Sequence, residues 1–153
     1  MANTFTQIYL QFVFAVQERA SLIRPEWEDE LYKYITGIVQ NNKHKLIAIN
    51  GMPNHVHVFI GYKPHQLIPD LLQDIKGSSS KWINDKHLVM GKFRWQEGYG
   101  AFSYSHSQID RVVKYINNQE QHHRTHSFHE EYSQLLRKFN IPFDERHILQ
   151  DVE

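Results

Sequence analysis

Cysteine is missing from this 153-residue chain, and its absence excludes a disulfide framework and a thiolate zinc site. Glycine and proline are few, and 41% apolar with 22% charged residues is the composition of an ordinary folded domain. No apolar run approaches the length that crosses a bilayer, and residues 1–7 lack the pattern of a secretory signal. We therefore expect a single domain over residues 1–153, a cytoplasmic location and no membrane partner.

An excess of either charge sign is also missing, because 17 basic and 17 acidic side chains cancel. Domains that bind nucleic acid usually carry a basic excess, so composition alone counts mildly against such a partner. Histidine is unusually abundant instead, with 11 copies. Because imidazole binds transition metals and carries protons near neutral pH, these histidines point to metal or proton chemistry.

The spacing of apolar residues predicts the order of strands and helices. Alternation with a period of two predicts strands at residues 8–16, 45–50, 55–60 and 93–104, the last of them broken by glycines. Helical spacing and start signals predict helices at residues 25–41 and 67–85, and two more that open at the capping-box pairs Ser107/Asp110 and Ser127/Glu130.

The order β-α-β-β-α-β, followed by two helices, matches the ferredoxin-like split βαβ unit. The predicted fold class is therefore α+β, with an antiparallel sheet and extra C-terminal helices. In such a unit the helices pack on one face of the sheet, and we expect the other face to stay open for ligands or partners.

His55 and His57 are separated by one residue inside a predicted strand, so their side chains point to the same face. The apolar residues Val56, Val58 and Ile60 point to the other face. Two imidazoles placed in this way can share one metal ion. Two surface or hydrogen-bonded histidines would give the same pattern, so the pair alone does not decide between these interpretations.

Tyr115 and Gln119 lie one turn apart on a polar stripe of the predicted third helix, beside its apolar face. A half-exposed tyrosine and a solvated glutamine would look the same. Together with the histidine pair, however, they provide what phosphodiester transfer needs, namely a nucleophile and a metal that polarises the phosphate. Mixed nitrogen and oxygen ligands suit Mn²⁺ and tolerate Mg²⁺, and Zn²⁺ is also compatible.

Four segments, taken together and in this order, resemble the single-tyrosine HUH transposases of insertion-sequence-200-like elements. That family is named after a His, hydrophobic, His motif, which His55, Val56 and His57 match. The segments are GMPNHVHVFI at 51–60, KGSSSKW at 76–82, WQEGYGAFS at 95–103 and YINNQ at 115–119.

The resemblance implies an enzyme that cuts and rejoins single-stranded DNA at insertion-sequence ends, often at hairpins, through a covalent bond between tyrosine and a 5′ phosphate. It implies Tyr115 as the nucleophile, and His55, His57 and Gln119 as ligands of Mg²⁺ or Mn²⁺. It also implies a homodimer whose active sites are shared between subunits. Gly98 and Gly100 would suit such an exchange, or they simply permit a bulge.

Basic residues near these segments are candidate contacts to DNA phosphates, and aromatic residues interspersed with them could stack on bases. The candidate contacts are Lys76, Lys81, Arg94 and Arg111. A plainer interpretation is that the aromatic residues form the core and that the lysines are solvated. Likewise, His122 and His126 could form a second metal site, or the histidines at 122–129 are a polar helix end.

Three other functions stay open for this sequence. An RNA-binding ferredoxin-like module would stack bases on the open sheet face. A replication or conjugation nicking enzyme shares the HUH chemistry, although relaxases carry their tyrosine before the histidines. A zinc hydrolase would need His55 and His57 but not Tyr115.

Overall fold

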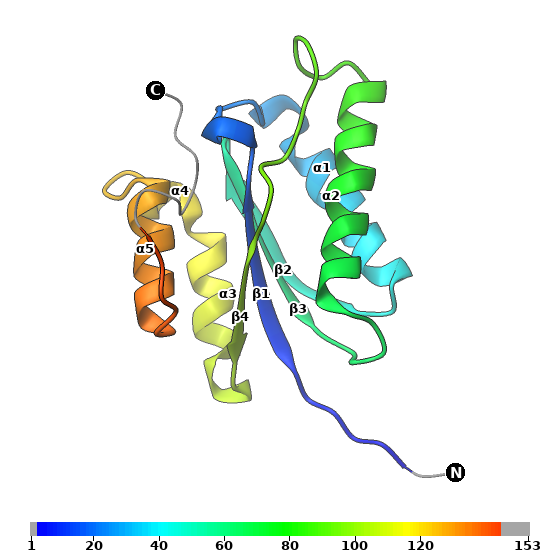
Figure 1. Ribbon diagram of the computed structural model, residues 1–153, viewed down its shortest axis with the longest axis vertical. Coiled ribbons are helices and arrows are strands. Elements are labelled where there is room, and N and C mark those ends of the chain that lie inside the picture. The colour runs from blue at the N-terminus through cyan, green and yellow to red at the C-terminus, as the bar shows by residue number, and fades with distance from the viewer. Residues whose placement is uncertain (1–2, 145–153) are drawn as a thin grey trace.

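The computed structural model describes residues 3–144 of the chain (Figure 1). In this part, the strands are β1 (Tyr9–Ala15), β2 (Lys45–Met52), β3 (His55–Gly61) and β4 (Gly100–Tyr104). The α-helices are α1 (Pro25–Asn41), α2 (Ile68–Asp85), α3 (Ile109–Asn117), α4 (Gln119–His122) and α5 (Phe128–Lys138). Short 3-10 turns cover Gln17–Arg19 and His106–Gln108.

The four strands form one sheet in the order β2-β3-β1-β4, and every neighbouring pair is antiparallel. The central strands β1 and β3 are therefore the first and third along the chain, as the split βαβ unit requires. The predicted α+β class with an antiparallel sheet and extra C-terminal helices is confirmed.

One face of the sheet packs against α1 and α2. Its buried residues alternate along the two central strands: Leu10, Phe12, Phe14, Val56, Val58 and Ile60. They meet the apolar stripes of the two helices, which include Leu31, Ile35, Leu71 and Ile75. Each such side chain contributes about 1.5–3 kcal/mol through its burial, so this face holds most of the apolar core.

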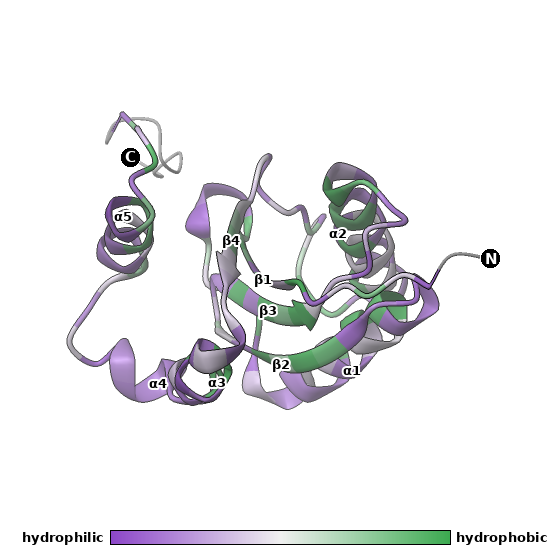
Figure 2. Ribbon diagram, turned by 90° about the horizontal axis from the view of Figure 1, so that it is seen from below, coloured by the Kyte–Doolittle hydropathy of each residue, from purple (hydrophilic) through white to green (hydrophobic). Residues whose placement is uncertain are grey.

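The opposite face is covered as well, which corrects the expectation of an open face. Figure 2 shows α1 and α2 on one side of the sheet and α3, α4 and α5 on the other. Val13 and Phe102 on this face pack under α5, and Phe59 packs under α3. Because these strand residues are apolar, leaving them in water would be unfavourable, and the C-terminal helices remove them from it.

The predicted fourth strand over 93–104 is too long, since β4 begins only at Gly100. Before it, Trp95 makes an isolated bridge to Val16, and Phe93 and Trp95 pack into the core. Lys76 holds this irregular segment against α2 by donating to the carbonyl oxygens of Gln96 (2.7 Å) and Gly98 (2.8 Å).

The predicted third helix differs at both ends. Its capping box is formed by Ser105 and Gln108 at a 3-10 turn, not by Ser107 and Asp110. The expected continuous helix breaks at Asn118, which leaves α3 and α4 as separate segments. The start of α5 is as predicted, because the Ser127 side chain accepts a hydrogen bond from the backbone of Glu130.

Across residues 3–144, the helices are all too short or too polar to traverse a lipid bilayer.

Candidate active site

His55 and His57 lie at the beginning of β3 and are fully buried on the face that α3, α4 and α5 cover. Each ring is oriented through its Nδ1 atom, which lies 2.7 Å from Asn54 Oδ1 in His55 and 2.8 Å from Gln11 Nε2 in His57. Both Nε2 atoms therefore point toward the C-terminal helices. An Nδ1–H that donates to an oxygen atom, as His55 can to Asn54, is typical of histidines that bind metals, whereas His57 Nδ1 accepts from the Gln11 amide.

The hairpin that carries the histidines depends on a close backbone approach at Gly51, which pairs with Val56. A Cβ atom at position 51 would lie 2.3 Å from the carbonyl oxygen of His55. Glycine thus allows β2 to approach the histidine strand closely.

Tyr115 lies in the last turn of α3 and Gln119 begins α4, so the helix break at Asn118 lies between them. Asn50 of β2 anchors the end of α3 by donating to the carbonyl oxygen of Ile116 (3.0 Å). The Tyr115 ring lies edge-on to His57, with ring centroids 5.7 Å apart, and Gln119 Oε1 lies 3.1 Å from His55 Nε2. The structure thus brings the four predicted residues of the YxxxQ and HUH motifs together within one chain.

Glu131 of α5 occupies the middle of this cluster, and the sequence analysis missed it. Its Oε1 atom lies 3.2 Å from His55 Nε2 and 3.1 Å from His57 Nε2. Its Oε2 atom accepts hydrogen bonds from the Tyr115 hydroxyl and from Gln119 Nε2 (3.0 Å). The side chain is only 2% exposed. A carboxylate buried this deeply needs partners for its charge. The two histidines, the tyrosine and the glutamine of the site are those partners.

A signal for Glu131 was present in the sequence. The helix that Ser127 opens places Phe128, Glu131, Tyr132 and Leu135 on one face, and all four are buried. An acidic residue inside an apolar helical stripe indicates a buried, partnered charge.

The histidines around Glu131 decide its charge. Burial alone would raise the pKa of the Glu131 carboxyl, but the charge of His57 and hydrogen bonds from His123 and His55 hold it well below its usual range. Burial lowers the pKa of His55 to about 4, against an opposing effect of Glu131. His55 is therefore neutral at physiological pH, and neutral imidazole is the form that binds metals.

Tyr115 is a protonated phenol in this arrangement. Burial, then the charge of Glu131 and the hydrogen bond to it, raise the pKa of Tyr115 above its ordinary value. A nucleophilic Tyr115 therefore needs a proton acceptor or a nearby cation. Because the pKa of Glu131 is held low, this carboxylate is a weak proton acceptor, and its hydrogen bond orients the phenol.

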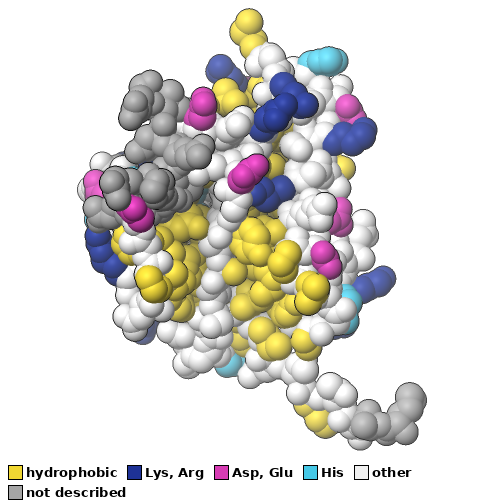
Figure 3. Space-filling model, viewed as in Figure 1, with side chains coloured by type: hydrophobic (Ala, Val, Ile, Leu, Met, Phe, Trp, Pro, Cys, Tyr) yellow, Lys and Arg dark blue, Asp and Glu magenta, His cyan; other side chains and the backbone are white. Residues whose placement is uncertain are grey.

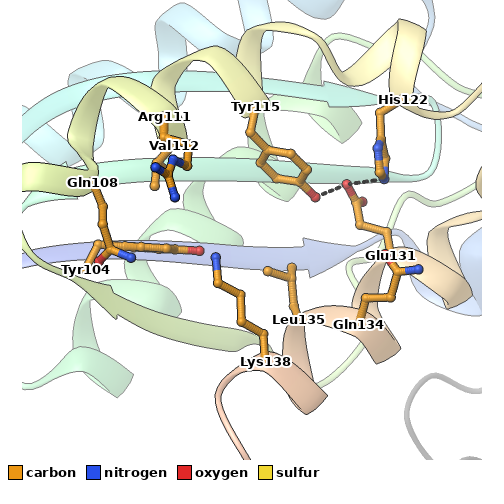
Figure 4. Close-up of a pocket in the computed structure, with 10 residues that line it drawn as sticks. All are labelled: Tyr104, Gln108, Arg111, Val112, Tyr115, His122, Glu131, Gln134, Leu135 and Lys138. Atoms are coloured by element: carbon orange, nitrogen blue, oxygen red, sulfur yellow. Dashed lines mark hydrogen bonds and ion pairs between the residues drawn. The ribbon is translucent and has the colours of Figure 1, made fainter.

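A cavity of about 250 Å³ lies between α3 and α5 and reaches Tyr115. Figure 4 shows Arg111 and Lys138 pointing into it from opposite sides, with the Tyr115 hydroxyl, Glu131 and His122 at its inner end. The predicted contact Arg111 thus lines the same cavity as Tyr115.

The other predicted DNA contacts lie elsewhere. Lys76, Lys81 and Arg94 line a groove between α2 and residues 92–97, on the other side of the sheet from Tyr115. Figure 3 shows Lys and Arg side chains gathered around this part of the molecule. Lys76 is occupied by backbone carbonyl oxygens, and the exposed Lys81 pairs with Asp85 at 2.6 Å. The structure does not bring these three cations together with Tyr115.

His122, the last residue of α4, and His126 stack with ring centroids 4.8 Å apart. Among residues 3–144, the only group of three or more His, Asp or Glu side chains close enough to share an ion is His55, His57 and Glu131, so the pair has no third such ligand. His123 instead joins the main cluster, with Nε2 3.0 Å from Glu131 Oε1, and His122 Nε2 lies 3.6 Å from Oε2.

Comparison with known proteins shows the family of this chain. The family model described as "Transposase IS200 like" matches residues 4–119, a segment that contains the histidine pair, Tyr115 and Gln119 but not Glu131. The ISDra2 transposase TnpA of Deinococcus radiodurans is 26% identical over an alignment of 118 residues, which covers 74% of this chain and 84% of that protein.

Two solved structures share the fold. A Deinococcus radiodurans R1 crystal structure described as a transposase has a TM-score of 0.63 and 25% identity, covering 78% of this chain and 95% of the other. The REP-associated tyrosine transposase bound to a REP hairpin has a TM-score of 0.57 and 13% identity, covering 77% of this chain and 70% of the other. At that identity the second likeness concerns the fold alone.

Proposed function

Because the chain belongs to the IS200-like transposase family, we propose that it cuts and rejoins single-stranded DNA by attack of Tyr115 on a phosphodiester. The observation that carries this proposal is the convergence of the Tyr115 hydroxyl, the His55 and His57 imidazoles and Gln119 on one buried cluster. The cavity beside Arg111 gives a DNA strand a route to that cluster.

The proposed reaction exchanges one phosphodiester for another. The Tyr115 oxygen forms a bond to phosphorus while the bond from phosphorus to the 3′ oxygen breaks, which leaves a 5′ phosphotyrosine and a free 3′ hydroxyl. Glu131 Oε2 orients the phenol through the existing hydrogen bond, the phenol proton is released to water, and the departing 3′ oxygen takes up a proton from water. Attack by a 3′ hydroxyl reverses the step, so rejoining needs no external energy source.

Mg²⁺ or Mn²⁺ is the proposed cofactor, and His55, His57 and Gln119 are its proposed ligands. Imidazole nitrogen with amide oxygen suits these ions, all three side chains are fully buried, and His55 Nε2 lies 3.1 Å from Gln119 Oε1. When bound, the ion would polarise the phosphate and neutralise the charge that develops on it.

Hairpin-containing ends of an insertion sequence are the proposed DNA substrate, and a homodimer is the proposed assembly. Sharing of active sites between subunits is not needed to bring Tyr115 to the histidines, because a single chain already places it against His57 and Glu131. We therefore propose that Tyr115 acts with the histidines of its own chain.

The test is to incubate the protein with Mn²⁺ and labelled single-stranded oligonucleotides from the flanks of its gene, and to look for a covalent adduct on a denaturing gel. We expect an adduct that disappears in Tyr115→Phe and with a chelator. Tyr34→Phe is the matched control, because that tyrosine is exposed and stacks on Trp82, away from the site. An adduct that survives Tyr115→Phe would refute the proposed nucleophile, and hydrolysis without an adduct would favour a metal hydrolase.

Mixing two inactive variants tests the arrangement of the subunits. Tyr115→Phe and His57→Ala chains, unfolded and refolded together, regain activity if a site combines the tyrosine of one chain with the histidines of the other. Sites contained in one chain gain nothing from the mixture, and that is the result we expect.

A further inference from the structure

Glu131 has more partners than a structural carboxylate requires. Its two oxygen atoms meet His55, His57 and His123 on one side and Tyr115 and Gln119 on the other. The residue lies on α5, beyond the segment 4–119 that matches the transposase family, so its role does not follow from membership of that family.

The distances around Oε1 are those of atoms that surround a common ion. Two ligand atoms that lie about 2.1 Å from a metal at a right angle are ~3.0 Å apart. Glu131 Oε1 lies 3.2 Å from His55 Nε2 and 3.1 Å from His57 Nε2, and Gln119 Oε1 lies 3.1 Å from His55 Nε2. These three spacings match neighbouring corners of one coordination sphere.

Charge supports the same conclusion. Two imidazole nitrogens and one amide oxygen as ligands would leave a divalent cation in a buried site without any compensating negative charge. Burying an unpaired charge is strongly unfavourable, and one carboxylate inside the site removes half of the excess. Among residues 3–144, Glu131 is the only acidic side chain that is buried.

We infer that Glu131 is a ligand of the divalent cation together with His55, His57 and Gln119, and that its second oxygen holds the Tyr115 hydroxyl beside that cation. The inference rests on the metal site of the proposed function. One carboxylate would then fix the distance between the metal and the nucleophile: Oε1 faces the histidines while Oε2 accepts from Tyr115.

Calorimetric titration with Mn²⁺ tests this inference without DNA or activity. Glu131→Gln keeps the size of the side chain and an oxygen for Tyr115 but removes the charge. We expect its Mn²⁺ affinity to fall about 10- to 100-fold, the range found even when outer partners of metal ligands are lost. Glu130→Gln, an exposed neighbour on the same helix, should bind Mn²⁺ like the unmodified chain.

The outcomes separate this inference from the proposed function. If His57→Ala abolishes Mn²⁺ binding while Glu131→Gln binds as tightly as the unmodified chain, the inference is wrong and the metal site stands. If both variants bind Mn²⁺ like the unmodified chain, the proposed metal site is wrong. Should Glu131→Gln fail to fold, Mn²⁺-soaked crystals of the unmodified chain decide: a Mn²⁺ peak bonded to Glu131 Oε1 supports the inference, and a peak at the histidines with Glu131 turned away overturns it.

Discussion

The two faces of strand β3 differ in what they do, although they share one backbone. Val56, Val58 and Ile60 meet α1 and α2 in the apolar core, whereas His55 and His57 meet a buried network of polar side chains. Strand alternation thus assigns stability to one face and chemistry to the other. A shift of one residue in register would exchange the two sets, so the core also fixes where the site lies.

The polar face is not stabilised by its polar groups alone. Apolar clusters lie on both sides of the site, one under α5 around Phe102 and one under α3 around Phe59. They hold the helices that deliver Glu131 and Tyr115. The site is therefore a polar pocket enclosed by a second, smaller core, and substitutions can probe the two faces separately.

The largest effect on stability should come from the apolar face. Phe12→Ala removes a fully buried ring between β1 and the helices, and we expect unfolding to become easier by about 3–5 kcal/mol in denaturant titrations. The Mn²⁺ affinity of the fraction that remains folded should be unchanged. A much smaller loss of stability would mean that α1 and α2 repack readily. The two faces would then contribute more equally to stability.

The next largest effect should come from the metal proposed to bind on the polar face. Mn²⁺ at 100 times its dissociation constant should stabilise the folded chain by about 2.7 kcal/mol, because the ion binds the folded state only. Thermal unfolding with and without Mn²⁺ measures the shift. His57→Ala should abolish it, while Phe12→Ala should keep it; a shift that persists in His57→Ala would locate the ion elsewhere.

A substitution at the hairpin should affect both faces. Gly51→Ala places a Cβ atom 2.3 Å from the His55 carbonyl oxygen, so the strands must separate, at a cost of about 1–3 kcal/mol. The stabilisation by Mn²⁺ in thermal unfolding should also decrease, because separating the strands displaces His55. Gly37→Ala on α1 is the matched control: its added methyl meets no atom within 4 Å, and alanine favours the helix by about 1 kcal/mol. Equal stability changes in the two variants would contradict the close approach.

The smallest effect distinguishes the two basic surfaces. Arg111→Ala should weaken binding of single-stranded DNA several-fold and reduce the dependence of affinity on salt by about one phosphate contact. Lys81→Ala should change neither, because Lys81 is exposed, pairs with Asp85 and lies away from Tyr115. Fluorescence anisotropy over a salt series measures both. A larger loss of DNA affinity in Lys81→Ala than in Arg111→Ala would indicate that DNA binds in the groove beside α2.

The sequence was sufficient for those features that depend on local periodicity. A period of two placed His55 and His57 on one face, and helical spacing placed Tyr115 near Gln119. Where the prediction was wrong, tertiary contacts decided. Asn50 of β2 fixes the end of α3, where the expected helix breaks, and no pattern within 107–122 reports a partner on a distant strand.

Glu131 also shows that local sequence patterns do not report tertiary partners. Its position on a buried stripe is a local property, but its partners come from β3, α3 and α4. The position of α5 over the sheet is decided by the packing of Phe128 and Leu135 in a cluster with Phe102. Sequence periodicity gives no information on where such a helix docks, so the expectation of an open sheet face also failed.

The distance along the chain between Glu131 and His57, 74 residues, has a consequence for the order of folding. Closing so long a loop is entropically unfavourable until other contacts have already brought its ends together. The β2–β3 hairpin joins neighbours in sequence, and we expect it and its apolar partners to form first. The sheet would then form before the cluster around Glu131 is assembled. A partly folded intermediate would contain Tyr115 without the assembled cluster that the proposed reaction on DNA requires.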